Sequence, residues 1–247
     1  VQAVSVTEHW ATYAVAGPLS RALLSAVLPD HDLSNAALPY MGACAVRWQG
    51  IAARLFRLSF SGELAFELSV PAQHGDALVR ALAEAGRPFG AALYGTGALG
   101  VMRLEKGHAR GNELKGATTA VDLGLGRMMS TKKDFIGRAM AKRPGLADPE
   151  RPRLVGLKPV DRAVRLRGGA HLLPRGAPPV AASDEGYVTS VAFSPTLGHW
   201  IALGFLRNGA LRHGERIIHH DPLRGGDALV EVCDPVFLDP EGVRVRG

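Results

Sequence analysis

The sequence has few of the features that define membrane, metal-binding or disulfide-rich proteins. Its 247 residues include two cysteines, Cys44 and Cys233, which lie far apart without metal-ligand spacing. No apolar run reaches the roughly 18 residues that cross a bilayer. Glu8 and His9 interrupt the first apolar segment, so no signal peptide is predicted. Both cysteines lie in strand-like apolar runs, and we expect reduced core thiols in a cytoplasmic protein with no membrane contact and no metal.

The charge pattern does not favour a nucleic-acid partner. The net charge is +6, but lysine and arginine are scattered along the chain. The nearest groups to clusters, Lys132–Lys133 and Arg162–Arg167, are not interleaved with aromatic residues as on a single-strand-binding surface. We expect a solvated basic surface.

Known catalytic motifs are also missing. Gly95, Gly97 and Gly100 have the spacing of a dinucleotide-binding turn, and Asp122 follows at about the right distance. That turn should follow a strand in a parallel βαβ unit, whereas this one follows a mixed pattern of strands and helices. No Ser/His/Asp or Cys/His set with a supporting motif is present, so no catalytic residue is assigned.

The composition that remains is that of a globular protein, with 47% hydrophobic and 21% charged residues. This length can form one large or two medium domains. The chain begins at Val1 inside an alternating, strand-like segment. We therefore expect a fragment, from which half of a site could be missing.

The first third of the chain predicts an α+β layer, in which helices cover one face of a mostly antiparallel sheet. Helices are expected from Pro18 and from Pro71, which suits a first helical turn. Gln49-Gly50 permits a tight hairpin turn. Strands are expected over residues 9–16, 44–48, 51–60 and 64–70, with another ending near residue 92.

The stretch Tyr94–Arg138 is dense in glycine and polar residues, which indicates a backbone that passes close to a ligand or another segment. Helices are expected over Thr96–Lys106, ending at Gly107, and over Phe135–Lys142, with the apolar stripe Phe135, Ile136, Ala139 and Met140.

A change of pattern follows residues 142–152, a proline-rich segment that is typical of a linker. The short β runs beyond it predict a small all-β barrel. We therefore expect two domains, residues 1–143 and residues 152–240.

Glu63 is the clearest candidate ligand-binding residue. It follows a glycine between two β runs, where a sheet ends and its carboxylate could accept two N–H groups of a pterin- or guanidine-like edge. The alternative is a turn carboxylate that faces water. Arg103, Glu105 and Lys106 are either part of a site or a charged helix end, and His108 is either a proton carrier or a structural loop residue.

Three stretches together resemble one family: SFSGELAFELSVP from Ser59, the whole of Tyr94–Arg138, and YVTSVAFSPTLGHWIALGFL from Tyr187. In the same order, they are similar to the folate-binding, aminomethyltransferase-like region of the glycine cleavage T-protein superfamily. Within that superfamily they resemble the C-terminal part of the alpha subunits of heterotetrameric sarcosine oxidases. The likeness runs from about Val6 to Phe237.

The resemblance implies a tetrahydrofolate site in a central cavity. It places the glutamate that holds the pterin at Glu63, and Tyr94 in the lining of the same cavity. It implies a flavin-containing beta subunit and other sarcosine oxidase subunits as partners, with FAD, FMN and NAD bound outside this chain. The beta subunit would oxidise sarcosine to an iminium, and the folate region would take its one-carbon unit, giving glycine and 5,10-methylenetetrahydrofolate.

Several departures from the family pattern bear on these expectations. Leu99 stands where the T-protein has an arginine, and the sarcosine oxidase group also lacks that arginine. An aspartate and a threonine of the family's site would lie upstream of Val1. His108 replaces the cysteine of the KGCYxGQ motif, which argues against iron–sulfur cluster maintenance. Two alternatives stay open: a stand-alone aminomethyltransferase-like protein, and a scaffold that docks a flavoprotein without binding folate.

Overall fold

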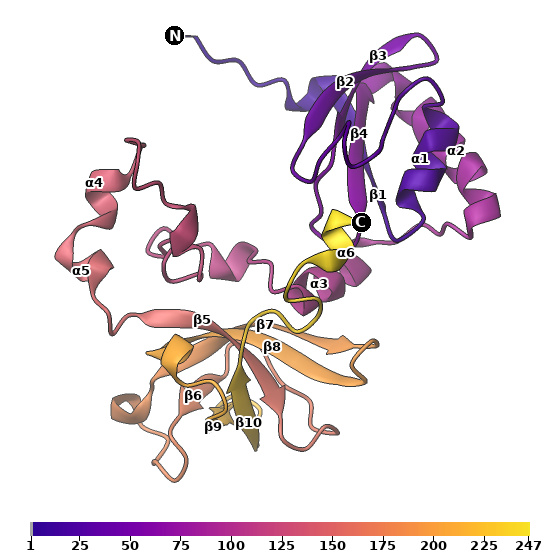
Figure 1. The fold of residues 1–247 in the computed structure, drawn as a ribbon. Helices are drawn as coiled ribbons and strands as arrows, with labels where there is room; N and C mark the ends of the chain where they lie inside the picture. The colour runs from indigo at the N-terminus through magenta and orange to yellow at the C-terminus, as the bar shows by residue number, and fades with distance from the viewer. Residues whose placement is uncertain (1) are drawn as a thin grey trace. The chain divides into compact units, whose positions relative to one another are not determined.

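A computed structural model describes residues 2–247, and the chain divides into two compact units (Figure 1). Of the described residues, the sheet unit comprises 2–99 together with 239–247, and the barrel unit comprises 100–238. Each is described by itself. The domain boundaries predicted at residues 143 and 152 divide the chain on a different basis and stay a prediction.

The sheet unit is built on a four-stranded antiparallel sheet with the order β1-β4-β3-β2. Its strands are β1 (Trp10–Ala16), β2 (Ala43–Trp48), β3 (Ile51–Phe56) and β4 (Ala65–Pro71). The predicted hairpin is confirmed, because Trp48 pairs with Ile51 across Gln49 and Gly50, whose φ angles are 49° and 79°. These positive φ angles at both turn positions match the right-handed twist of the strands.

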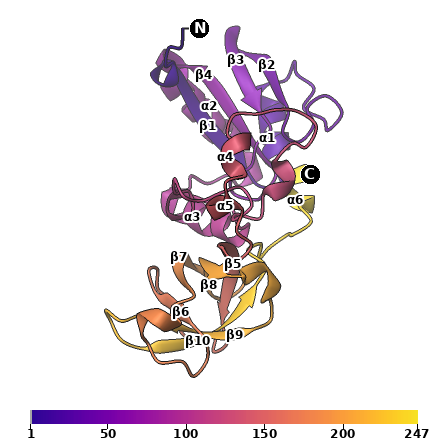
Figure 2. The same ribbon diagram turned by 90° about the vertical axis from the view of Figure 1, so that its left-hand side faces the viewer.

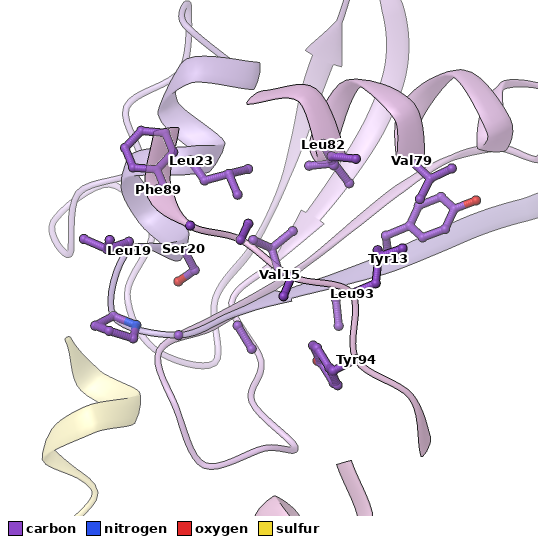
Figure 3. A pocket seen from close by; sticks show the side chains of 18 residues that line it. Tyr13, Val15, Leu19, Ser20, Leu23, Val79, Leu82, Phe89, Leu93 and Tyr94 are labelled. Carbon is purple, nitrogen blue, oxygen red and sulfur yellow. The ribbon is translucent and has the colours of Figure 1, made fainter. Parts of the chain in front are cut away.

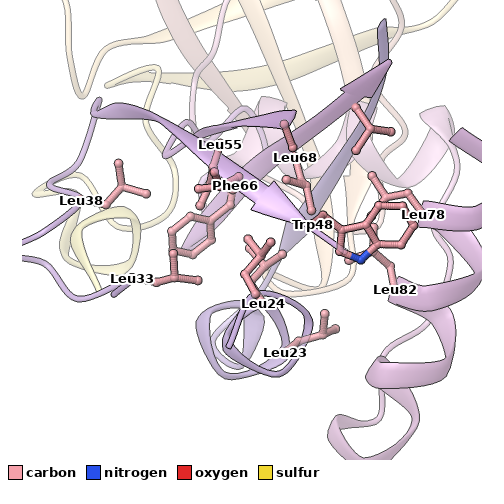
Figure 4. Close-up of a cluster of buried hydrophobic side chains, with 14 of the residues drawn as sticks. Leu23, Leu24, Leu33, Leu38, Trp48, Leu55, Phe66, Leu68, Leu78 and Leu82 are labelled. Atoms are coloured by element: carbon pink, nitrogen blue, oxygen red, sulfur yellow. The ribbon is translucent and has the colours of Figure 1, made fainter. Parts of the chain in front are cut away.

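Helices α1 (Ser20–Val27) and α2 (Gly75–Gly86) cover one face of this sheet (Figures 1 and 4). Every second side chain of each strand points towards them, as the pleat requires. The buried core contains Leu24, Trp48, Leu55, Phe66, Leu68 and Leu78. The predicted α+β layer is therefore confirmed.

Two details of the sheet unit differ from prediction. Strand β3 ends at Phe56, four residues early. The strand expected near residue 92 is absent: a 3-10 turn, Arg87–Phe89, follows α2, and the chain then runs irregularly. Pro88 has no N–H to donate, and Gly90 has a φ of 66°, so neither suits a strand at this point.

The expected core position of Cys44 is also wrong. Both thiols are free, but Cys44 is exposed near the start of the edge strand β2, whereas Cys233 is half-buried. Burial raises the pKa of Cys233 to about 11, and Glu231 and Asp234 add to the shift against an opposing effect of Lys158. Burial raises the pKa of Cys44 as well.

We expect the two thiols to react with a disulfide reagent at clearly different rates. The thiolate is the reactive form, and a pKa of about 11 leaves Cys233 almost wholly protonated at pH 8. A spectrophotometric thiol assay on the folded protein should show a fast phase that Cys44→Ser removes and Cys233→Ser retains. A fast phase that persists in Cys44→Ser would contradict the assignment.

The barrel unit contains a closed barrel of six strands in the order β10-β5-β8-β7-β6-β9 (Figure 2). Leu157, Leu172, Val188, Ile217 and Val230 belong to its fully buried core. The predicted small all-β barrel is confirmed. Its strands are β5 (Pro152–Pro159), β6 (His171–Leu173), β7 (Gly186–Ser194), β8 (His199–Arg207), β9 (Arg216–His220) and β10 (Asp227–Cys233).

The helix predicted over Phe135–Lys142 is shorter than expected. Helix α4 covers Arg138–Ala141, and Gly137 before it has a left-handed φ of 95°. The predicted apolar stripe is wrong, since Ile136 and Met140 are exposed. The other helices are α3 (Thr96–Glu105), α5 (Pro144–Ala147) and α6 (Val243–Arg246). Across residues 2–247, no helix combines the length and apolarity needed to cross a membrane.

Candidate functional site

Glu63 lies in the tight loop between β3 and β4, where the sheet ends. Gly62 has a φ of 88°, and its N–H donates to Ser59 Oγ at 3.0 Å, which fixes the turn. The Glu63 carboxylate does not simply face water. Its Oε1 accepts a hydrogen bond from Arg244 Nη1 at 2.7 Å, and the Glu63 side chain keeps 29% of its surface exposed.

Arg244 belongs to the C-terminal segment 239–247, which packs on the sheet unit. The Asp239 carboxylate precedes α6 and accepts hydrogen bonds from the first two N–H groups of the helix, those of Val243 at 2.8 Å and Arg244 at 3.2 Å. Val245 is buried, so the short helix is anchored by an apolar side chain. Arg244 lies 181 residues from Glu63, and no local sequence pattern could have predicted the pair.

The same segment is anchored by two polar side chains, buried Arg57 and exposed Asn35. Arg57 is only 1% exposed; its guanidinium donates to Asn35 Oδ1 at 2.6 Å and to the carbonyl of Arg246. Asn35 Nδ2 donates to the Gly247 carbonyl at 2.8 Å, and its Oδ1 also accepts from Arg21 at 2.6 Å. Burial, and then the neighbouring charge of Arg21, lower the pKa of Arg57. This network holds Arg244 where it meets Glu63.

Tyr94 lines an apolar cavity of about 370 Å³ in the sheet unit (Figure 3). Strand β1, helices α1 and α2 and residues 89–94 form its walls, with Val15, Leu23 and Leu82 among the lining residues. Burial, and then the charge of Glu67, raise the pKa of the Tyr94 hydroxyl. Glu63 is not among the residues that line this cavity, so a common site of Glu63 and Tyr94 stays a prediction.

The charged end of α3 serves the barrel unit as a structural anchor. Arg103 donates to Glu113 Oε2 at 3.2 Å and to Ser190 Oγ at 2.7 Å, and Ser190 Oγ donates to Glu113 Oε1 at 2.6 Å. Glu105 accepts from Ser194 Oγ at 2.5 Å. Arg103, Glu105 and Glu113 are all buried, so they tie α3 and its loop to strand β7.

Asp122, the acidic residue of the possible dinucleotide motif, is bound by arginines. Its carboxylate accepts hydrogen bonds from Arg151 at 2.8 Å and from Arg153 at 3.1 Å. Burial alone would raise the pKa of Asp122, but hydrogen bonds from Arg151 and Thr119 hold it below its usual value. The sheets of both units are also antiparallel. The fold therefore gives no support to a dinucleotide-binding motif at Gly95, Gly97, Gly100 and Asp122.

The histidines of residues 2–247 belong to no cluster that could hold a metal ion. His219 is buried, whereas His220 on the other face of β9 pairs with Asp227 at 2.6 Å. His171 pairs with Asp184 at 2.8 Å. Among residues 2–247, no group of three histidine, cysteine or acidic residues is placed to hold a metal ion.

Two family models match the chain, one over its N-terminal part and one over the barrel that follows. The GCVT N-terminal domain matches residues 1–133, and the glycine cleavage T-protein C-terminal barrel domain matches residues 153–239. The chain belongs to the glycine cleavage T-protein family. The fold expected from the resemblance is confirmed by these matches.

Among curated proteins, the sarcosine oxidase subunit alpha of Rhizobium meliloti is 46% identical over all of this chain and 25% of its own length. The subunit of the same name from Corynebacterium sp. strain P-1 is 39% identical over all of this chain and 26% of its own length. This chain therefore spans about a quarter of these relatives.

Aminomethyltransferases are similar over less of the chain. The enzyme from Streptomyces avermitilis is 38% identical over 81% of this chain and 52% of its own length. The crystal structure of the glycine cleavage system aminomethyltransferase T from Bartonella henselae superposes with a TM-score of 0.73, covering 94% of this chain and 60% of that one. Its sequence identity of 24% supports the fold alone.

Proposed function

We propose that this chain is the tetrahydrofolate-binding part of a sarcosine-oxidase-type alpha subunit. It accepts the one-carbon unit of oxidised sarcosine, and the products are 5,10-methylenetetrahydrofolate and glycine. The observation that carries the proposal is the 46% identity over the whole chain with a sarcosine oxidase subunit alpha. A flavin-containing beta subunit supplies the iminium, and flavin and NAD bind outside this chain.

Glu63 is the residue that would hold the pterin. Its carboxylate is partly exposed at the end of the sheet, and a pterin edge offers two N–H groups to a carboxylate in a charge-assisted pair. Arg244 donates a hydrogen bond to Glu63 Oε1, so on ligand binding it either shares the carboxylate with the pterin or breaks this hydrogen bond. Tetrahydrofolate supplies the amine that takes up the carbon. The protein contributes binding and orientation, since proximity alone lowers the barrier of such a transfer substantially.

Calorimetric titration of the chain with tetrahydrofolate tests this role. Loss of a charge-assisted contact costs about 1.5–3 kcal/mol, so Glu63→Ala should weaken binding at least tenfold. The affinity of Glu63→Gln for tetrahydrofolate should lie between those of wild type and Glu63→Ala, because glutamine keeps one acceptor oxygen. Glu84→Ala removes an exposed carboxylate of α2 and is the matched control, with wild-type affinity expected. Equal affinity of Glu63→Ala and wild type would remove Glu63 from the site.

A second candidate is a scaffold that docks a flavoprotein subunit without binding folate. The pairing of Glu63 with Arg244 favours it, because the carboxylate already has a partner within the chain. Capture of a flavin-containing sarcosine oxidase subunit, together with no heat of binding from tetrahydrofolate, would support this function over the first.

A further inference from the structure

The loop between β5 and β6 presents two arginines on the outside of the barrel. Leu166 is buried in the core at the centre of this loop, and the flanking residues Arg165 and Arg167 line the hollow outside. The backbone of Arg167 is fixed, because its N–H donates to His219 Nε2 at 2.9 Å. These two guanidinium groups therefore sit on an anchored loop.

An aromatic pair lies beside them. Phe193 and Trp200 face each other across the β7–β8 hairpin, with ring centroids 5.9 Å apart at 75°. The Arg165 guanidinium carbon lies 4.9 Å from the centre of the Trp200 ring, which orients it by a cation–π contact. Phe193 is 45% exposed, so its ring remains accessible. The basic cluster that looked free of aromatics in the sequence gains them through the fold.

A third arginine, Arg224, lines the same hollow. Buried Asp221 lies between Arg167 and Arg224, at 3.6 Å from a nitrogen of each. Two guanidinium groups thus share one carboxylate, and Arg165 adds a third positive charge to the lining of the hollow. Both ion pairs are long, and Asp221 Oδ1 also accepts hydrogen bonds from the N–H groups of Leu223 at 3.0 Å and Arg224 at 3.2 Å. An excess of positive charge remains beside the aromatic pair.

We propose that this surface, the Arg165 patch (Arg165, Arg167, Phe193, Trp200 and Arg224), binds an acidic segment of a partner polypeptide. Carboxylates of the partner pair with the guanidinium groups, and an apolar side chain packs on Phe193 and Trp200. The hollow that Trp200 and the three arginines line measures about 270 Å³, which suits one or two side chains, and Phe193 lies beside it against Trp200. Tryptophan and arginine together are typical of the energetic centre of protein interfaces.

The size of the patch favours a polypeptide over a nucleic acid. Single-stranded nucleic acids bind along basic grooves that follow several nucleotides and stack on successive aromatic rings. Here three arginines surround one small hollow with a single aromatic pair. The relatives that match the whole chain are named as subunits, so partner polypeptides are the natural occupants.

Fluorescence anisotropy with a labelled twelve-residue peptide, rich in glutamate with one central phenylalanine, tests the proposal on the whole chain. The double variant Arg165→Ala/Arg224→Ala should weaken binding at least tenfold, and Phe193→Ala severalfold. The control Arg175→Ala/Arg216→Ala removes the same charge from exposed positions elsewhere on the barrel unit and should change binding less than twofold. Arg224→Glu reverses the charge at an exposed position and keeps a long side chain, and it should also weaken binding of the peptide.

Three results would overturn the proposal. One is an acidic peptide that does not bind, and another is an equal loss in both double variants, which would show only a general charge effect. The third is displacement of the peptide by a twelve-nucleotide oligothymidine at a lower concentration than by unlabelled peptide. A lysine-rich peptide with the same central phenylalanine should not bind.

Discussion

Replacing Gly107 with alanine is expected to destabilise the barrel unit by about 3 kcal/mol or more. Gly107 has a left-handed φ of 72°, and a Cβ placed there would lie 2.5 Å from the carbonyl oxygen of Pro235 and 2.8 Å from its carbonyl carbon. The left-handed conformation alone costs a non-glycine residue roughly 1–2 kcal/mol. The contact adds to this because backbone atoms, unlike the end of a flexible side chain, cannot move aside without shifting the segment.

Gly124→Ala separates the two effects. Gly124 has nearly the same φ, 75°, but no atom lies within 4 Å of its Cβ position. Urea denaturation followed by circular dichroism should therefore show a loss of about 1 kcal/mol for Gly124→Ala and a clearly larger one for Gly107→Ala. Similar losses would mean that the segment at Pro235 yields to the new methyl group.

Gly107 illustrates which parts of the fold can be predicted from sequence. The end of α3 follows from local chemistry, since helices commonly end at a left-handed glycine. The reason that no other residue fits lies at Pro235, 128 positions later in the chain, and periodicity carries no information about it. Local patterns likewise predicted the Gln49-Gly50 hairpin and the small all-β barrel correctly.

Prediction failed where apolar character was taken as burial. Ile136 was placed on a helix stripe but is fully exposed before α4 begins. Cys44 is in phase with Val46 and Trp48, yet Cys44 is exposed whereas the other two side chains are buried. Pattern shows which face of a strand or helix a residue occupies, but only the packing of other elements decides whether that position is buried.

In the candidate site, too, the local sequence indicates some residues but not the distant residues that contact them. Glu63 could be selected because a glycine turn at a sheet end is a local signal, but its partner Arg244 could not. Arg103 and Glu105 remained ambiguous in the sequence, since their partners Ser190 and Ser194 come from strand β7. Charged residues at a helix end look alike whether they bind a ligand, face water or form a buried network.

Glu113→Gln is expected to destabilise the barrel unit by about 3–4 kcal/mol, because removing one member of a buried ion pair leaves the other charge uncompensated. Glu113 is fully buried and accepts from the Arg110 N–H at 2.8 Å, besides Arg103 and Ser190. Glutamine preserves the volume but brings an amide donor to a position where the Arg103, Arg110 and Ser190 groups all donate to the carboxylate. Urea denaturation measures the loss.

Two variants identify the cause. Glu84→Gln removes a carboxylate from an exposed pair with Arg87, 3.0 Å apart, and should cost no more than about 0.5 kcal/mol. Arg103→Met/Glu113→Gln removes both buried charges and should be more stable than Glu113→Gln alone, because no unpaired ion remains. If the double variant is the less stable one, the guanidinium stabilises α3 through Ser190 and the His108 carbonyl rather than through Glu113.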